Sequence, residues 1–242
     1  MVRTLGGIME LRVNGRRELV RPGTHLCQLF TLEDDATSFA AAFLSMGARG
    51  GFRAVYWGPA ARAQAIKDLL LSEAAETEQD VVHFEHVGTR SEVLLQNRLD
   101  PYHLISLHQS ALDRALAESW RGLCLVLDMT WLAGGASTVE QVVKYEAAAE
   151  SVFPYQARPL VMLVQYQHTR ATDALAAELL RLHPVSIIGR IMRRNPQHVD
   201  AEDYLRGLIR PPRQQPAPEP LVFPGERHRR PPRFGRGLLR FP

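Results

Sequence analysis

The feature that most limits the possible folds is an apolar run that ends in an acid, LCLVLD, with Asp128 at its end. A strand in a parallel sheet covered by helices on both faces is continuously apolar, and ligands of such sheets bind beyond the carboxyl ends of the strands. We therefore interpret 123–127 as a buried strand with Asp128 at its tip. Ser137 or Thr138 can cap the helix that the apolar spacing predicts over 138–153.

The same alternation of short apolar runs and helical periodicity extends over most of the chain. Strands that alternate with helices of ten to sixteen residues favour right-handed crossovers, and so an α/β fold with three layers, in which helices cover both faces of a mostly parallel sheet. A short helix over 201–208 is expected to close this body. The predicted elements are the strands 25–30, 52–57, 81–87, 123–127, 160–165 and 185–192, and the helices 35–47, 59–75, 104–120, 138–153 and 172–182.

A hairpin is predicted before this body. Apolar and polar residues alternate over 9–13, and Asn14-Gly15 separates them from 16–20. Asn-Gly between alternating residues is a strong signal for a tight turn between two strands, because both turn positions need positive φ. We expect residues 1–23 to form a β-hairpin extension at the edge of the main fold.

The C-terminal segment has a different composition from the rest. It contains nine prolines from Pro211 onward, and over 210–242 eight arginines stand against two glutamates. This charge of +6 leaves −3 for the remainder, since the whole chain carries +3. Such a segment cannot bury enough apolar surface to fold, so we predict a disordered, flexible tail behind a domain at 24–209. Its basic residues can attract a protein or a nucleic acid by charge, and the candidates are Arg227, Arg229, Arg230, Arg233 and Arg236.

Composition favours a protein of the cytoplasm. The chain is 45% apolar and 23% charged, and it contains no apolar run near the roughly 20 residues that a membrane span needs. The N-terminus has no signal-peptide pattern. The cysteines, Cys27 and Cys124, both lie in apolar runs, which suits reduced core thiols.

Asp128 is also where a nucleotide hydrolase would hold magnesium. Such an enzyme needs a glycine-rich phosphate loop, but Gly58 is followed by Pro59, and no Gly-Lys-Ser or Gly-Lys-Thr occurs in the chain. A nucleotide binder related to ATPases but without the phosphate loop is therefore only a third hypothesis. We expect no catalytic residues and no enzymatic activity.

Two further groups could form a site. His25 and Cys27 share one strand face, but a structural zinc needs four ligands and no spacing completes the set. The alternative is a packed cysteine beside a hydrogen-bonded histidine, so no metal and no cofactor are expected. Trp131, Tyr145 and Tyr166 suit the wall of a pocket for a small, largely apolar ligand, or else they close the top of the core.

With these pieces in place, the chain resembles the MEDS sensory domain of methanogens and methylotrophs. The resemblance rests on HLCQLF at 25–30, RLDP at 98–101, RGLCLVLDMTW at 121–131, KYE at 144–146, VQY at 164–166 and LHPVSIIG at 182–189. It implies a RecA-like fold with a degenerate Walker motif and no phosphate loop, serving as an input domain that senses small organic molecules. The residues that it implies around one ligand site are His25, Cys27, Asp128, Trp131, Tyr145, Glu146, Gln165, Tyr166 and His183.

The chain departs from the family pattern at a few positions. Val164 and Gln167 stand where the family has cysteine and aspartate around Gln-Tyr, and Leu99 replaces a phenylalanine. No kinase motif or helix-turn-helix follows the domain, so we expect it to act on a partner. The leading hypothesis is a non-enzymatic regulatory protein that binds a small organic ligand at the carboxyl edge of the sheet. The alternative is an interaction adaptor whose pocket is vestigial and whose tail recruits a protein or a nucleic acid.

Overall fold

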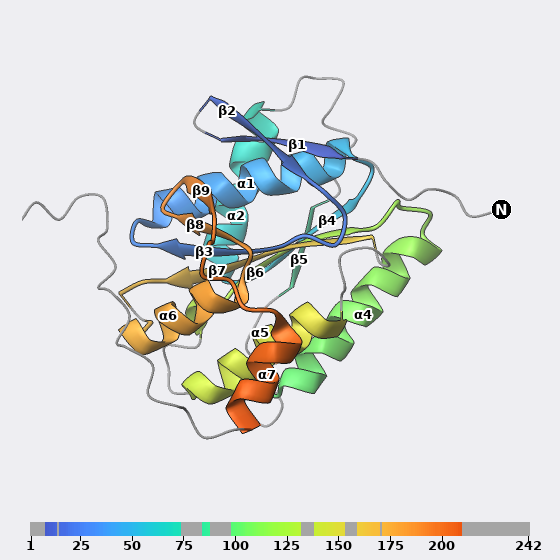
Figure 1. Ribbon diagram of the computed structural model, residues 1–242. Coiled ribbons are helices and arrows are strands. Elements are labelled where there is room, and N and C mark those ends of the chain that lie inside the picture. Colours follow the sequence, from blue (N-terminus) through green and yellow to red (C-terminus); the bar gives the residue numbers. More distant parts are fainter. Residues whose placement is uncertain are drawn as a thin grey trace, which may run out of the picture.

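Figure 1 shows the computed structural model of the protein, in which the main sheet lies between two layers of helices. The structure describes residues 8–13, 15–73, 84–87, 98–131, 138–152, 159–169 and 171–209. The predicted tail at 210–242 therefore lies outside the described residues, as do 81–83 of the third predicted strand.

The main sheet has seven strands in the order β5-β4-β6-β7-β3-β8-β9. All neighbours pair in parallel except β8 and β9, which are antiparallel. The prediction of a mostly parallel α/β sheet is confirmed. The strands are β3 (His25–Phe30), β4 (Arg53–Trp57), β5 (Phe84–Val87), β6 (Leu123–Asp128), β7 (Leu160–Gln167), β8 (Val185–Ile188) and β9 (Ile191–Arg194).

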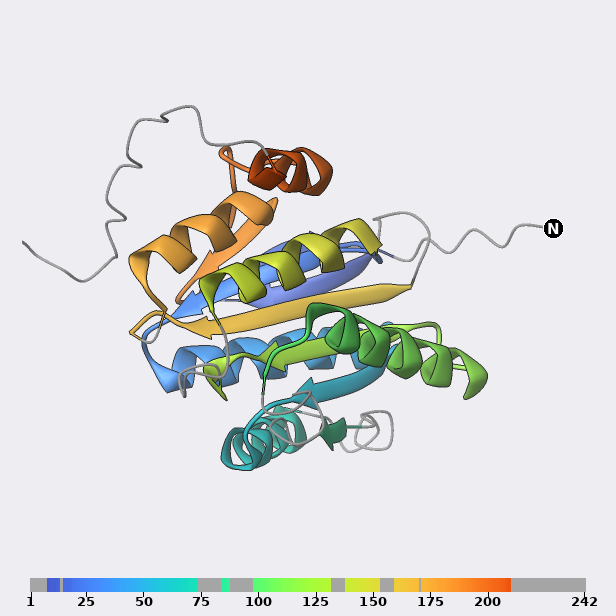
Figure 2. The same ribbon diagram turned by 90° about the horizontal axis from the view of Figure 1, so that it is seen from below.

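Helices cover both faces of this sheet (Figure 2). The first pair, α1 (Glu33–Arg49) and α2 (Ala60–Glu73), lies on the face that buries Leu26, Val126 and Leu163. The opposite face carries α4 (Pro101–Ala117), α5 (Val139–Val152) and α6 (Asp173–Leu182), and α7 (Ala201–Ile209) packs on α5. Alternate residues of the inner strands β3, β4, β6 and β7 therefore face two different cores, and this decides which predicted site residues can meet.

Helix starts follow their capping residues. The side chain of Asp100 accepts a hydrogen bond from the backbone N–H of His103 at 2.8 Å, and Pro101 occupies the first helical position. Helix α4 therefore begins three residues before the predicted Leu104, because the prediction missed this cap. At α5, Thr138 is the cap: its hydroxyl accepts from the N–H of Gln141 at 3.2 Å, and the Gln141 side chain accepts from the N–H of Thr138 at 3.0 Å.

The N-terminal hairpin is present, as strands β1 (Met9–Val13) and β2 (Arg16–Val20). Gly15 has a φ of 73°, which is the conformation that the turn requires. The pair forms a separate two-stranded sheet that packs on α1 (Figure 1). It therefore adds a layer outside the helices instead of extending the edge of the main sheet.

The prediction of one last strand over 185–192 is wrong. The chain turns at Gly189, which has a φ of 59°, and returns as β9 antiparallel to β8. The turn was not predicted because Gly189 is the single turn-forming residue in an otherwise strand-like run. The Gln28 side chain fixes the turn by donating a hydrogen bond to the carbonyl oxygen of Gly189 at 2.6 Å.

Close packing of α1 on the sheet depends on a glycine. A Cβ at Gly47 would lie 2.4 Å from the Cβ of Cys124 on β6, so the helix approaches β6 only because no side chain intervenes. Cys27 and Cys124 are both buried free thiols. No helix in the described part of the chain is long and apolar enough to cross a membrane.

Candidate functional site

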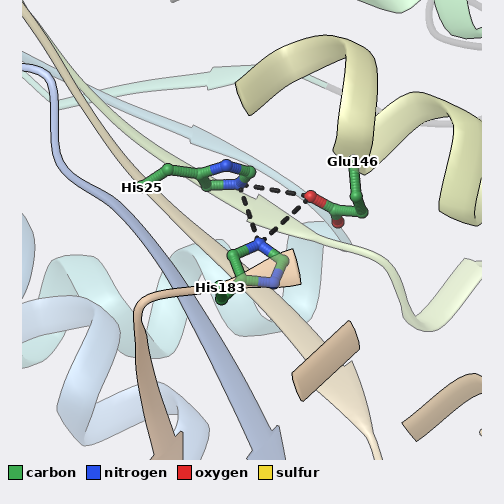
Figure 3. A group of neighbouring side chains, drawn as sticks. All are labelled: His25, Glu146 and His183. Atoms are coloured by element: carbon green, nitrogen blue, oxygen red, sulfur yellow. Dashed lines mark hydrogen bonds and ion pairs between the residues drawn. The ribbon is translucent and has the colours of Figure 1, made fainter. Parts of the chain in front are cut away.

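Three buried polar side chains converge at the amino ends of the strands (Figure 3). His25 is the first residue of β3, Glu146 lies in the middle of α5, and His183 follows the last residue of α6. The Nε2 atoms of His25 and His183 lie 3.2 and 3.3 Å from Oε2 of Glu146, and 3.3 Å from each other. The three residues are at most 5% exposed, so this polar group lies inside an apolar core.

A second set of contacts fixes the outer atoms of the same side chains. Nδ1 of His183 lies 2.7 Å from the carbonyl oxygen of Leu179, and Nδ1 of His25 lies 3.0 Å from Oε2 of Glu150. The hydroxyl of Tyr166 donates to Oε1 of Glu146. A carbonyl and a carboxylate accept hydrogen bonds, so each Nδ1 carries the proton of its ring, and the Nε2 atoms face the centre.

The electrostatics of the cluster favour charged forms. Burial opposes a charge on His25, but close contacts with Glu146 and Glu150 raise its pKa to about 9. Burial likewise opposes the charge of Glu146, yet the contacts with His183 and His25 hold its pKa below the usual value. Burial and the charge of Glu146 raise the pKa of Tyr166, so its hydroxyl keeps its proton.

Cys27 lies on the same sheet face as His25, as the alternation predicted. Burial raises the pKa of its thiol well above the usual value. The thiol is therefore protonated and is a poor metal ligand. The donor atoms that come within 4.8 Å of one another belong to His25, Glu146 and His183, without Cys27.

An aromatic group lies on the same face, nearer the carboxyl ends of the strands. The rings of Trp57 and His108 are 5.0 Å apart, and those of His108 and Tyr145 are 5.8 Å apart. Trp131 packs against this core, half-buried. Within the described residues, the indole N–H groups of Trp57 and Trp131 are buried without a hydrogen-bond partner. A buried unsatisfied donor costs about 1–3 kcal/mol, so these two can bind an acceptor that enters the core.

Asp128 lies on the opposite face, in a different network. Its Oδ2 atom accepts hydrogen bonds from the Tyr56 hydroxyl, at 2.8 Å, and from Arg62, and its Oδ1 accepts from the N–H of Thr130 at 2.9 Å. Arg62 also pairs with Glu33 in the first turn of α1. Sequence reasoning missed Arg62, although it shares the inward stripe of α2 with Ile66 and Leu70. A charged residue on the apolar face of a helix indicates that a partner of opposite charge is buried beside it.

Gln165 is also on the face of α1. Its amide donates to Oε1 of Gln28 at 2.6 Å and to the carbonyl oxygen of Ala36 at 2.9 Å. This links β7, β3 and α1 beside Asp128, to which Gln165 is paired in the sheet.

The nine predicted site residues thus do not surround one point. Side chains alternate between sheet faces, and this separates Asp128 and Gln165 from the rest. His25, Glu146, His183 and Tyr166 make direct contacts, and Tyr145 and Trp131 pack in the same core. The cluster lies at the amino ends of the strands, whereas the predicted position was the carboxyl edge. The predicted residues at that edge are Asp128, Trp131, Gln165 and Tyr166, at or just beyond the ends of β6 and β7.

A surface hollow of about 510 Å³ lies between β1 and the end of α1. Its lining includes Arg12, Arg49 and Arg121. Arg12 pairs with Glu10, and Arg121 donates to the carbonyl oxygen of Gly50 at 3.0 Å. None of the predicted site residues lines it.

No curated protein matches the chain. Among protein families, the model described as "MEthanogen/methylotroph, DcmR Sensory domain" matches residues 24–184, two thirds of the chain. The match begins one residue before His25 and ends one residue after His183, so it includes all three members of the buried cluster. The chain belongs to the MEDS family of sensory domains.

Proposed function

We propose that this protein is a non-enzymatic signalling protein whose MEDS domain binds a small organic ligand and transmits the signal to a partner protein. The observation that carries the proposal is the family match over 24–184, because the family is one of sensory domains. Buried polar groups without partners in the described residues support our choice of the ligand site and of its contacts.

The ligand site that we propose lies on the face of α4 and α5, beside Trp57 and Trp131. Ligands of parallel sheets bind near the carboxyl ends of the strands, and Trp57 is the last residue of β4. Two buried indole donors without partners in the described residues favour a ligand with hydrogen-bond acceptors on an apolar body. Tyr145 connects this group to the cluster, because its hydroxyl contacts the sulfur of Met162, which pairs with His25 in the sheet.

The network around Asp128 argues for sensing over nucleotide hydrolysis. Arg62 already supplies the positive charge that a magnesium ion would bring to this carboxylate. Helix α1 begins three residues after the end of β3, and its first turn carries Glu33, Asp34 and Asp35. Carboxylates at that helix start repel phosphate groups, so this strand-to-helix turn is as poorly suited to a phosphate loop as the sequence at Gly58 and Pro59.

A thermal-shift screen of the full chain tests the proposal. The panel contains alcohols, amides, carboxylates and amines of low molecular mass, and nucleotides with magnesium as a separate arm. A ligand at a hundred times its dissociation constant stabilises the folded state by about 2.7 kcal/mol. We expect at least one organic compound to raise the melting temperature of the parent protein.

The matched variants are Trp131→Phe and Trp120→Phe. Trp131→Phe keeps a ring but loses the donor, so the shift caused by the ligand should shrink, whereas Trp120→Phe should keep it. If no compound shifts the parent, the adaptor hypothesis replaces this one. A binding partner should then be captured by the full chain and lost on deletion of the basic segment 210–242. A shift by nucleotides alone would favour the third hypothesis.

A further inference from the structure

We propose that His25, Glu146 and His183 bind a divalent transition-metal ion, with zinc the best candidate, through the two Nε2 atoms and Oε2 (Figure 3). The inference does not depend on the proposed function, because the metal alone is the probe. It departs from the expectation from sequence that no metal is bound. The reason is that the ligands come from positions 25, 146 and 183, so no short spacing reveals them.

The spacing of the three donor atoms matches the face of a tetrahedral site. Zinc binds imidazole nitrogen and carboxylate oxygen at about 2.0–2.1 Å, so two ligands of a tetrahedral ion lie about 3.3–3.4 Å apart. The three observed separations are 3.2, 3.3 and 3.3 Å. One ion can therefore bind all three donor atoms without movement of the backbone.

Hydrogen bonding does not account for the centre of the cluster. Both Nδ1 atoms carry their protons outward, so in the neutral rings the two Nε2 lone pairs and Oε2 face one another. Within the described residues, Oε2 of Glu146 is buried and accepts no hydrogen bond of acceptable geometry. A proton on His25 leaves the lone pair of His183 facing Oε2 at 3.3 Å, whereas one cation can bind all three atoms.

The outer contacts are those that metal-binding histidines make. Such a histidine usually donates its second N–H to a carbonyl or a carboxylate, which fixes the ring and its tautomer. His183 faces the carbonyl of Leu179 at 2.7 Å, and His25 faces Glu150 at 3.0 Å. Tyr166 holds the other oxygen of Glu146. All three proposed ligands are therefore oriented before an ion arrives.

Charge and donor type select the ion. Two neutral imidazoles with Glu146 and Glu150 carry −2, which a divalent ion neutralises inside the core. Two nitrogens and one oxygen suit zinc or ferrous iron better than magnesium or calcium, which prefer oxygen ligands. Three protein ligands leave one position of a tetrahedral ion open to water or a small molecule.

The test measures metal in the full chain without a histidine tag. The three residues are buried, so an ion enters as the chain folds or when the cluster opens. We would unfold the protein in the presence of a chelator, remove the chelator, and refold the protein with one equivalent of zinc or cobalt. We expect about one ion per chain after desalting and a melting temperature about 5–10 °C above that of protein refolded with chelator. Cobalt should give the absorption bands of a tetrahedral ion.

Glu146→Gln and His183→Gln should lose both the ion and the shift. His108→Gln is the matched control, because it also removes a fully buried histidine of this core but should keep the ion. If Glu146→Gln and His183→Gln do not fold, the metal content and melting temperature of the parent, refolded with metal or with chelator, decide the question. Substoichiometric metal and equal melting temperatures in the two parent samples would overturn the proposal, as would retention of the ion by Glu146→Gln.

Discussion

Arg62→Met should be among the most destabilising single changes in this protein. It removes the cationic partner of Asp128, a carboxylate with no exposed surface, and leaves that charge in the core. Breaking a buried ion pair in this way costs about 3–5 kcal/mol. The second partner of Arg62, Glu33, has a side chain that is 55% exposed, so loss of that pair contributes little.

The double variant Arg62→Met with Asp128→Asn tests the cause. It removes both charges and keeps a side chain that still accepts from Tyr56, so it should be more stable than Arg62→Met alone. Free energies of unfolding come from urea titrations followed by circular dichroism, with equal slopes required between variants. Arg206→Met is the matched control. Its pairs with Glu202 and Asp203 are exposed, so it should change stability by less than about 1 kcal/mol.

Additive losses of stability would show that Arg62 and Asp128 do not form a coupled pair. If the double variant loses the sum of the two single losses within about 0.5 kcal/mol, the two residues are not coupled. A magnesium-dependent gain in stability that requires Asp128 and survives in Arg62→Met would likewise show that the carboxylate serves a metal.

Four further changes follow from local geometry. Gly47→Ala should lower the free energy of unfolding by about 1–3 kcal/mol in urea titrations. The new Cβ would overlap Cys124, and this overlap outweighs the gain in helix propensity. A gain in stability would refute the close packing of α1 on β6. Gly189→Ala should cost about 1–2 kcal/mol and Gly189→Asn less, since φ is positive there; equal losses would contradict this. Thr138→Ala should lose about 1 kcal/mol, whereas no loss would mean that the cap is dispensable. Burial, and then the positive charge of a neighbouring histidine, lower the pKa of His108 to about 3 in the folded protein, against 6.5 unfolded. The unfolded chain therefore binds the proton first, and the stability of the parent protein falls as the pH drops below about 6.5. Between about pH 7 and pH 5, His108→Leu should lose less stability than the parent. An equal loss in both proteins would refute the low pKa of His108.

The order of strands and helices could be predicted because their apolar patterns are strong. The run at 123–127 identified a buried strand, and Ser137 or Thr138 marked the start of the next helix, where the structure has Thr138 as the cap. The turn at Gly189 was missed because β8 and β9 together read as one apolar strand. The hairpin was predicted as an addition to the main fold, but its packing on α1 was not, because alternation predicts that two strands pair and not which surface their apolar side will cover.

The candidate site was predictable only in part. Alternation placed His25 and Cys27 on one face, and the family resemblance selected Glu146 and His183. Sequence could not show that their donor atoms meet, because that depends on how α5 rotates over β3 and where α6 ends. It could have shown that Gln165 and Tyr166 point to opposite faces, since neighbouring residues of one strand alternate, but the face of Asp128 relative to the other strands depends on the register of the sheet.

We propose that sensing occurs on the face of α4 and α5, beside Trp57 and Trp131. The chain has three tryptophans, so nuclear magnetic resonance of ¹⁵N-labelled protein should give three indole N–H signals. Each is assigned with a tryptophan-to-phenylalanine variant. A compound that raises the melting temperature should move the signals of Trp57 and Trp131 and leave that of Trp120 in place. No movement of these two signals at saturating ligand, or movement of the Trp120 signal alone, would contradict the account.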